Sequence, residues 1–263
     1  MNEILGYFSA IFIGITLGLI GGGGSILTVP VLVYILTIEP ILATAYSLFV
    51  VGFSALVGTF RNIKKGNIDV EIGVIFALPS LLAVYITRRY LVPSIPQEIL
   101  KLENFTLSKE IGIMLFFALV MFLAGISMIR GRKNNKKVKN KKINYPILII
   151  EGLFVGVFTG LVGAGGGFLI IPALVLLAGL PMKNAIATSL MIIAIKSLLG
   201  FTGDLSTTLN IDWTFLISFS AFSILGMGFG LYMSKFIEAE KLKKLFGYFI
   251  LFMAVFVFIK EII

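Results

Sequence analysis

The stretch Gly18-Leu-Ile-Gly-Gly-Gly-Gly-Ser25 interrupts an apolar run that otherwise extends from Ile4 to Ile38. A glycine inside a helix costs about 1 kcal/mol relative to alanine, so four in a row favour a break in the helix. A similar stretch, Gly160-Leu-Val-Gly-Ala-Gly-Gly-Gly167, lies in the second half of the chain. Because such a break occurs twice within apolar sequence, we expect the exposed backbone of these stretches to have a function.

The two glycine-rich stretches belong to an internal duplication. A shift of 142 residues aligns them, together with small and polar residues that follow. The aligned pairs include Gly21 with Gly163, Gly24 with Gly166, Pro30 with Pro172, Ser47 with Ser189 and Gly58 with Gly200. One inserted residue later, Asn67-Ile-Asp69 matches Asn210-Ile-Asp212. The repeat is far too long for a solenoid, whereas two homologous halves are an architecture that transporters use.

The composition indicates a membrane protein. Hydrophobic residues make up 58% of the 263 residues, against about 45–50% in soluble domains. The apolar segments are continuous and do not alternate, so they predict helices and not strands. Ten segments are expected, at 4–20, 25–38, 41–60, 70–90, 111–129, 145–162, 167–180, 184–203, 213–234 and 243–262.

Several classes of function are excluded by composition and motif. The chain has no Cys and no His, which removes thiol chemistry, haem ligation by His and most zinc sites. Neither glycine-rich stretch continues into the Gly-Lys-Ser/Thr of a phosphate loop. We therefore expect no enzyme, no catalytic residues, no metal and no cofactor. The net charge of +9 comes mostly from one lysine-rich segment, so no nucleic-acid partner is expected.

The basic residues predict the topology. The segment 130–142 carries eight Lys or Arg and no acid, as cytoplasmic loops often do. With it inside, 16 basic residues fall on inside loops and five outside, with one lysine left within a span. The outside set is Arg88, Arg89, Lys101, Lys109 and Lys260. This predicts a multi-pass protein of the cytoplasmic (inner) membrane with both termini outside. A first membrane repeat, 1–130, is joined to a second, 145–263, by a basic cytoplasmic linker, 131–144.

This topology requires the stretches 4–38 and 145–180 each to begin and end on one side. Each would be a glycine-broken re-entrant helical hairpin, followed by three transmembrane helices. Because three is odd, the halves would have opposite orientations. The expected fold class is an all-α integral membrane protein built from two inverted repeats. The segment 4–20 is nearly long enough to span, at about 25 Å, and a single broken crossing there would make the halves parallel instead.

These residues resemble the sulfite exporter TauE/SafE family of membrane transporters. The resemblance rests on the two glycine-rich stretches with their prolines and on three further motifs. These are Ala43-Thr-Ala-Tyr-Ser-Leu48, Ala185-Ile-Ala-Thr-Ser-Leu190 and Gly66-Asn-Ile-Asp69. The resemblance covers nearly the whole chain. It implies transport of sulfite, sulfonates or related sulfur anions across the cytoplasmic membrane, but neither the particular anion nor the direction.

The glycine tips are the first candidates for an anion site. Helices that begin near Ser25 and Gly167 would aim free N–H groups and about half a positive charge at the membrane centre. The alternative is that the glycines only permit close packing, and nearby hydroxyls could equally bond their own backbone. Because Ser25 aligns with Gly167 and Gly22 with Ala164, a central site would be asymmetric. The candidate substrate-binding residues here are Gly22, Gly23, Gly24, Ser25, Ser47, Ala164, Gly165, Gly166, Gly167, Thr188 and Ser189.

Lys196 is the last candidate substrate-binding residue. It lies about 18 Å into its span, where an ammonium is costly and usually faces a cavity or a partner. It would attract an anion on the pathway, or else pair structurally with Asp204 or Glu151. Glu151 is expected to be interfacial, with proton coupling as the alternative, and Asp69 and Asp212 are expected to cap helices.

Together these features predict a secondary transporter for a small anion, working by alternating access. The expected partners are the anionic substrate and membrane lipid, and a coupling proton or ion and a homo-oligomer stay open. An anion channel with the same site is the main alternative. A membrane-embedded enzyme and a cation carrier fit less well, because the lone intramembrane lysine and the helix N-termini favour anions.

Overall fold

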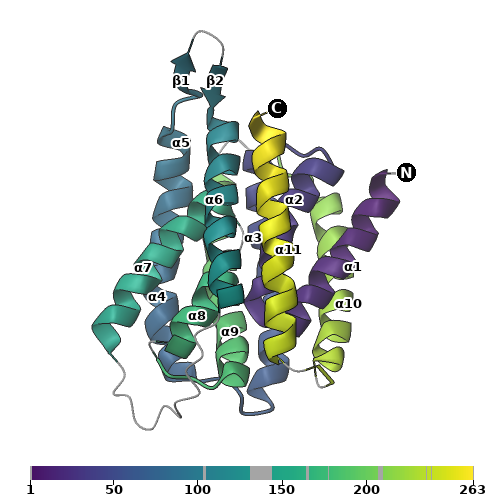
Figure 1. Ribbon diagram of the computed structural model, residues 1–263, viewed down its shortest axis with the longest axis vertical. Helices are drawn as coiled ribbons and strands as arrows, with labels where there is room; N and C mark the ends of the chain where they lie inside the picture. Colours follow the sequence, from purple (N-terminus) through teal and green to yellow (C-terminus); the bar gives the residue numbers. More distant parts are fainter. Residues whose placement is uncertain are drawn as a thin grey trace.

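The structure is a computed structural model that describes residues 2–102, 105–130, 144–163, 166–176, 178–206, 210–234, 236–237 and 239–262. The basic linker lies almost entirely outside these residues, as do Ala164 and Gly165 of the second glycine-rich stretch. The described residues form helices joined by turns and loops, together with one short β-hairpin (Figure 1).

Two sets of helices follow one another along the chain. The first set is α1 (Asn2–Ile20), η1 (Gly21–Leu27), α2 (Thr28–Pro30), η2 (Val31–Ile35), α3 (Pro40–Ile63), α4 (Val70–Ile86), η3 (Thr87–Leu91), α5 (Val92–Ser94) and α6 (Lys109–Arg130). The second set is α7 (Tyr145–Val162), α8 (Gly167–Leu176), α9 (Met182–Phe201), η4 (Asp204–Ser206), α10 (Trp213–Met233) and α11 (Ala239–Ile262). The antiparallel strands β1 (Glu98–Leu102) and β2 (Phe105–Ser108) precede α6.

The expected membrane class is confirmed. Six of the described helices are long and apolar enough to cross a membrane: α3, α4 with its extension to Ser94, α6, α7, α9 and α10. Large apolar side chains are widely exposed on the surface, including Phe8 at 68% and Phe252 at 67%. Such a surface suits contact with lipid chains. The β-hairpin was not predicted, because its strands are too short to stand out from a polar loop.

The chain reverses direction at each glycine-rich stretch. Gly21 and Gly163, which the shift of 142 residues aligns, both have φ of +69°. This left-handed conformation costs glycine little. A β-carbon on Gly24 would overlap the backbone of Leu17, so the returning segment lies directly on α1. The glycines of the first stretch were predicted as a break before a helix at Ser25, but they themselves form the 3-10 helix η1. In the second stretch, α8 begins at Gly167 as expected.

The two halves pack together through equivalent pairs of helices. Helix α1 packs on α10 of the other half, and its counterpart α7 packs on α4. Helices α3 and α9 pair with each other, as do α6 and α11. In Figure 1 the chain termini lie at the same end as the β-hairpin, and the ends of α6 and α7 next to the linker lie at the opposite end. The contacts therefore follow a pseudo-two-fold pattern.

Two aspartates join the halves at equivalent places. Asp69 and Asp212 cap α4 and α10, each accepting a hydrogen bond from a backbone N–H at 3.0 Å, which confirms their predicted role. The Asp69 backbone N–H donates to the Thr188 hydroxyl at 3.0 Å, and the Asp212 N–H donates to the Tyr46 hydroxyl at 2.6 Å. Each half thus supplies an acceptor to the first turn of a helix in the other half.

Close packing of α1 on α10 gives a stability prediction. A β-carbon on Gly226 would overlap the Ile11 carbonyl oxygen, whereas a β-carbon on Gly228 meets nothing within 4 Å. We expect Gly226→Ala to destabilise the protein by about 1–3 kcal/mol through overpacking. The control Gly228→Ala should leave stability unchanged or raise it by up to about 1 kcal/mol, through helix propensity. Thermal unfolding in detergent compares the two, and equal melting temperatures would contradict the packing.

Candidate functional site

The two glycine-rich stretches touch each other. A β-carbon on Gly167 would overlap the Cα, carbonyl carbon and carbonyl oxygen of Gly22. A β-carbon on Gly22 would in turn overlap Gly167 and the side-chain end of Ile193 on α9. The two backbones approach this closely only because neither residue has a side chain. The contact supports the packing explanation for Gly22 and Gly167, which sequence reasoning had left beside the anion explanation.

Lys196 lies beside the second glycine-rich stretch. Its side chain is fully buried, and its Nζ donates a hydrogen bond to the Thr159 hydroxyl at 2.9 Å. A β-carbon on Gly166 would lie 2.9 Å from Nζ, so only glycine leaves the ammonium unobstructed here. Among the described residues no carboxylate forms an ion pair with Lys196, and the predicted alternative partner Asp204 is bound to Arg88 instead. Lys196 is therefore a buried cation with one neutral hydrogen-bond partner in the described chain.

The structure brings only some of the predicted residues to this place. Gly166 adjoins Lys196, and Gly22 and Gly167 meet next to α9. The hydroxyls of Ser25 and Ser189 donate to the carbonyls of Gly22 and Ile186, at 2.7 and 2.8 Å. The remaining predicted residues divide as follows: Thr188 accepts from Asp69, Gly23 and Gly24 belong to η1, and Ala164 and Gly165 lie outside the described residues.

Three buried side chains near the core retain hydrogen-bonding capacity. The hydroxyls of Thr28, Ser47 and Ser197 are buried and have no hydrogen-bond partner in the described part of the chain. Ser197 follows Lys196 directly in α9. A buried polar group in a membrane protein is normally satisfied, so these hydroxyls are able to take part in binding a polar ligand. One oxygen of the Glu151 carboxyl is likewise buried and without such a partner.

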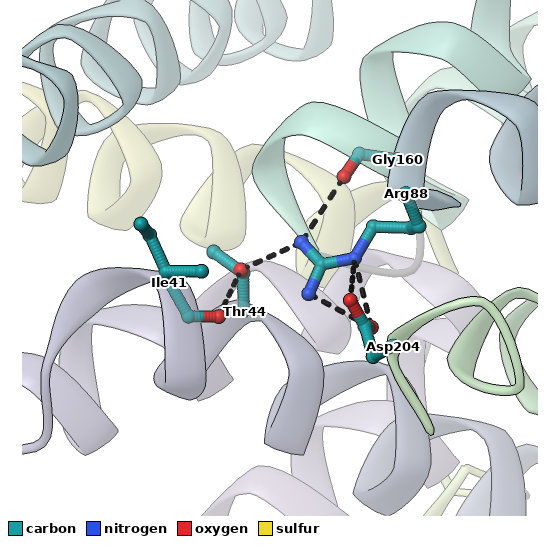
Figure 2. Close-up of polar contacts among 5 residues, drawn as sticks. All are labelled: Ile41, Thr44, Arg88, Gly160 and Asp204. Carbon is teal, nitrogen blue, oxygen red and sulfur yellow. Dashed lines mark hydrogen bonds and ion pairs between the residues drawn. The ribbon is translucent and has the colours of Figure 1, made fainter. Parts of the chain in front are cut away.

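A second buried cation was missed by sequence reasoning. Arg88 had been counted as an outside-loop residue, but it lies in η3 with a side chain that is 0% exposed. Its Nε donates to both carboxylate oxygens of Asp204, at 2.9 and 2.8 Å (Figure 2). Its Nη1 donates to the Thr44 hydroxyl at 2.8 Å and to the Gly160 carbonyl at 3.3 Å. The available signal was Leu91-Val92, apolar residues that continue the span after the two arginines.

Asp204 is held in this cluster against the cost of burial. Burial raises the pKa of its carboxyl, and the charge and hydrogen bonds of Arg88 oppose that rise. The Thr44 hydroxyl accepts a hydrogen bond from Arg88 Nη1 and donates one to the Ile41 carbonyl at 2.7 Å (Figure 2). The Arg88 cation thus stabilises the ionised form of a carboxyl group whose ionisation burial disfavours.

The chain is similar to proteins described as membrane transporters. The family model described as "Sulfite exporter TauE/SafE" matches residues 7–257. A "Probable membrane transporter protein" of Xylella fastidiosa (strain 9a5c) is 30% identical, over 93% of this chain and 90% of that protein. A relative with a similar name in Methanocaldococcus jannaschii is also 30% identical, over 74% of this chain and 69% of that protein. No solved structure matches the chain. The chain belongs to the sulfite exporter TauE/SafE family of membrane transporters.

Proposed function

We propose that this protein is a secondary transporter that moves a small anion through a central site at Lys196. The observation that carries the proposal is the fully buried ammonium, which has one neutral partner in the described chain and lies beside the second glycine tip. An ionised group so far from water needs a counter-charge. A transported anion supplies one, while the N-terminus of α8 adds a favourable dipole from the same side.

We further propose that both glycine-broken hairpins enter and leave the membrane on the same side. This is supported by the chain reversals at Gly21 and Gly163 and by the exchange of equivalent contacts between the halves. The outer helices of the hairpins differ, because α7 is long enough to cross a membrane, whereas the apolar part of α1, Leu5–Ile20, is shorter. With the basic linker in the cytoplasm, the termini and the β-hairpin would be outside. The halves would then be inverted repeats that alternately expose the site.

The proposed substrate is sulfite or a related sulfur oxyanion or organosulfonate. The family is described as sulfite exporters, and a buried ammonium beside the Thr159 hydroxyl suits an oxyanion. A channel would use the same site but would show no counter-transport. A saturable exchange of external for internal anion therefore separates the two mechanisms.

Proteoliposome uptake tests the proposal. Purified protein is offered sulfite, thiosulfate, sulfate, a sulfonate and an amino acid, with and without a pH gradient. We expect saturable uptake of at least one sulfur anion and acceleration by the same anion trapped inside. A pH gradient that changes the initial rate would identify proton coupling. Protein-free liposomes are the control, and uptake of none of the anions above that control would overturn the proposal.

A further inference from the structure

We propose that Arg88 is a second oxyanion-binding station on the pathway and that Asp204 occupies it in the present conformation. This inference rests on the proposed function. It adds a second anion site, at Arg88, next to the one at Lys196. The ligand it would take is an oxyanion such as sulfite or a sulfonate, whose oxygens would replace the two oxygens of the Asp204 carboxylate.

The chemistry of the site is that of an anion receptor. The Arg88 guanidinium is fully buried and faces Asp204: Nε donates hydrogen bonds to both carboxylate oxygens, and Nη2 lies 2.8 Å from Oδ2 in an ion pair but donates no hydrogen bond. A planar guanidinium of this kind recognises carboxylates and other oxyanions through several parallel hydrogen bonds. Thr44 and Gly160 hold Nη1 independently of Asp204. The guanidinium can therefore keep its position while its anionic partner changes.

The station is connected to the Lys196 site by neighbouring residues. In α7, the Thr159 hydroxyl accepts a hydrogen bond from Lys196. The carbonyl of the next residue, Gly160, accepts one from Arg88. Lys196 lies in α9, which ends at Phe201, and Asp204 follows three residues later at the start of η4. Consecutive residues of α7 thus contact both buried cations, which makes the Arg88 cluster a neighbour of the Lys196 site.

The cluster has no counterpart in the other half. The internal repeat aligns Arg88 with Leu231 and Thr44 with Ile186, so the second copy of this place has neither the cation nor the hydroxyl. A pair required by the fold alone would be expected in both copies of so regular an arrangement. The Arg88–Asp204 pair occurs in only one of the two equivalent places. This fits a binding step that the anion makes on one side of the central site and not on the other. Asp204 then acts as a tethered competitor that closes the station when no substrate is bound.

The test compares Asp204→Asn, Arg88→Gln and the double variant in proteoliposomes, with labelled sulfite as the probe. Asp204→Asn removes the competitor, so the half-saturating sulfite concentration should fall about tenfold. In detergent, added sulfite should also raise the melting temperature of this variant more than that of the wild type. Arg88→Gln should abolish uptake. Arg89→Gln changes the neighbouring half-buried arginine and serves as the matched control, with wild-type uptake expected.

The double variant guards against a failure to fold. Arg88→Gln alone leaves a buried carboxylate without its cation, whereas neutralising both partners is often tolerated. We expect the double variant to melt near the wild-type temperature and still lack uptake. Wild-type uptake by the double variant, or an unchanged half-saturating concentration in Asp204→Asn, would show a purely structural pair and overturn the inference. Absence of uptake by the wild type itself would instead overturn the proposed function.

Discussion

Anion uptake by Lys196→Met is expected to fall about 30- to 150-fold, because the variant loses a charge-assisted interaction of about 2–3 kcal/mol with the substrate. Methionine keeps the length and apolar character of the side chain but has no charge. Since Lys196 has no ion-paired carboxylate among the described residues, its neutralisation leaves no unpaired acid behind. The fold should therefore survive, and the melting temperature should stay level or rise.

Lys183→Met is the matched control for this experiment. Lys183 lies in the first turn of the same helix α9, and it is exposed. The same chemical change there should leave the initial rate of uptake unaltered. Lys196→Arg keeps the charge and should retain part of the activity. If Lys196→Met transported at the wild-type rate, the ammonium would have no part in the pathway. If it failed to fold, Lys196 would be a structural residue.

Gly167→Ala is expected to yield little folded protein, since the added carbon would overlap three backbone atoms of Gly22. Backbone cannot move aside as the end of a flexible side chain can. The hairpin tips would have to separate, which costs packing at both tips at once; overpacking of this kind typically costs about 1–3 kcal/mol, and here no rotamer relieves it. Monodispersity on size exclusion and the melting temperature measure the effect.

The reciprocal variant tests the same contact from its other side. Gly22→Ala would overlap Gly167 and Ile193, so it should show a defect of the same kind. The double variant should be no better than either single one, because both added carbons point into one contact. Gly228→Ala, in open space, controls for the loss of a glycine as such. A Gly167→Ala protein as stable as the wild type would show that the tips do not meet.

Most of the fold could be predicted from the sequence because the dominant signals are local. Long apolar segments and the repeated glycines locate the helices to within a few residues, as at α7, predicted and found at 145–162. The caps at Asp69 and Asp212 follow from the preference of an acid for a helix N-terminus. Contacts between the two halves could not be predicted, because no local sequence pattern encodes them. The hydrogen bond from the Asp69 N–H to the Thr188 hydroxyl is an example.

The candidate site was predictable only where a charge stood out. Lys196 did, because a lone lysine within an apolar span is conspicuous. Its partner Thr159 did not, because a threonine in a membrane helix usually bonds its own backbone, and Thr159 also donates to the Val155 carbonyl at 2.7 Å. Arg88 was misjudged because charge counting assigned it to an outside loop, whereas its span continues past it to Ser94. The arginine therefore lies within an apolar span and not in a loop.

The packing of α1 on α10 also bears on how the protein is made. During synthesis α1, which ends at Ile20, leaves the ribosome long before α10, which begins at Trp213. Helix α1 must therefore wait for its partner while the helices between them, α3 to α9, are translated. Chaperoning of that early intermediate, more than the strength of any finished contact, would then limit the yield of the mature protein. Truncation before α10 should leave a nascent chain that quality-control proteases degrade.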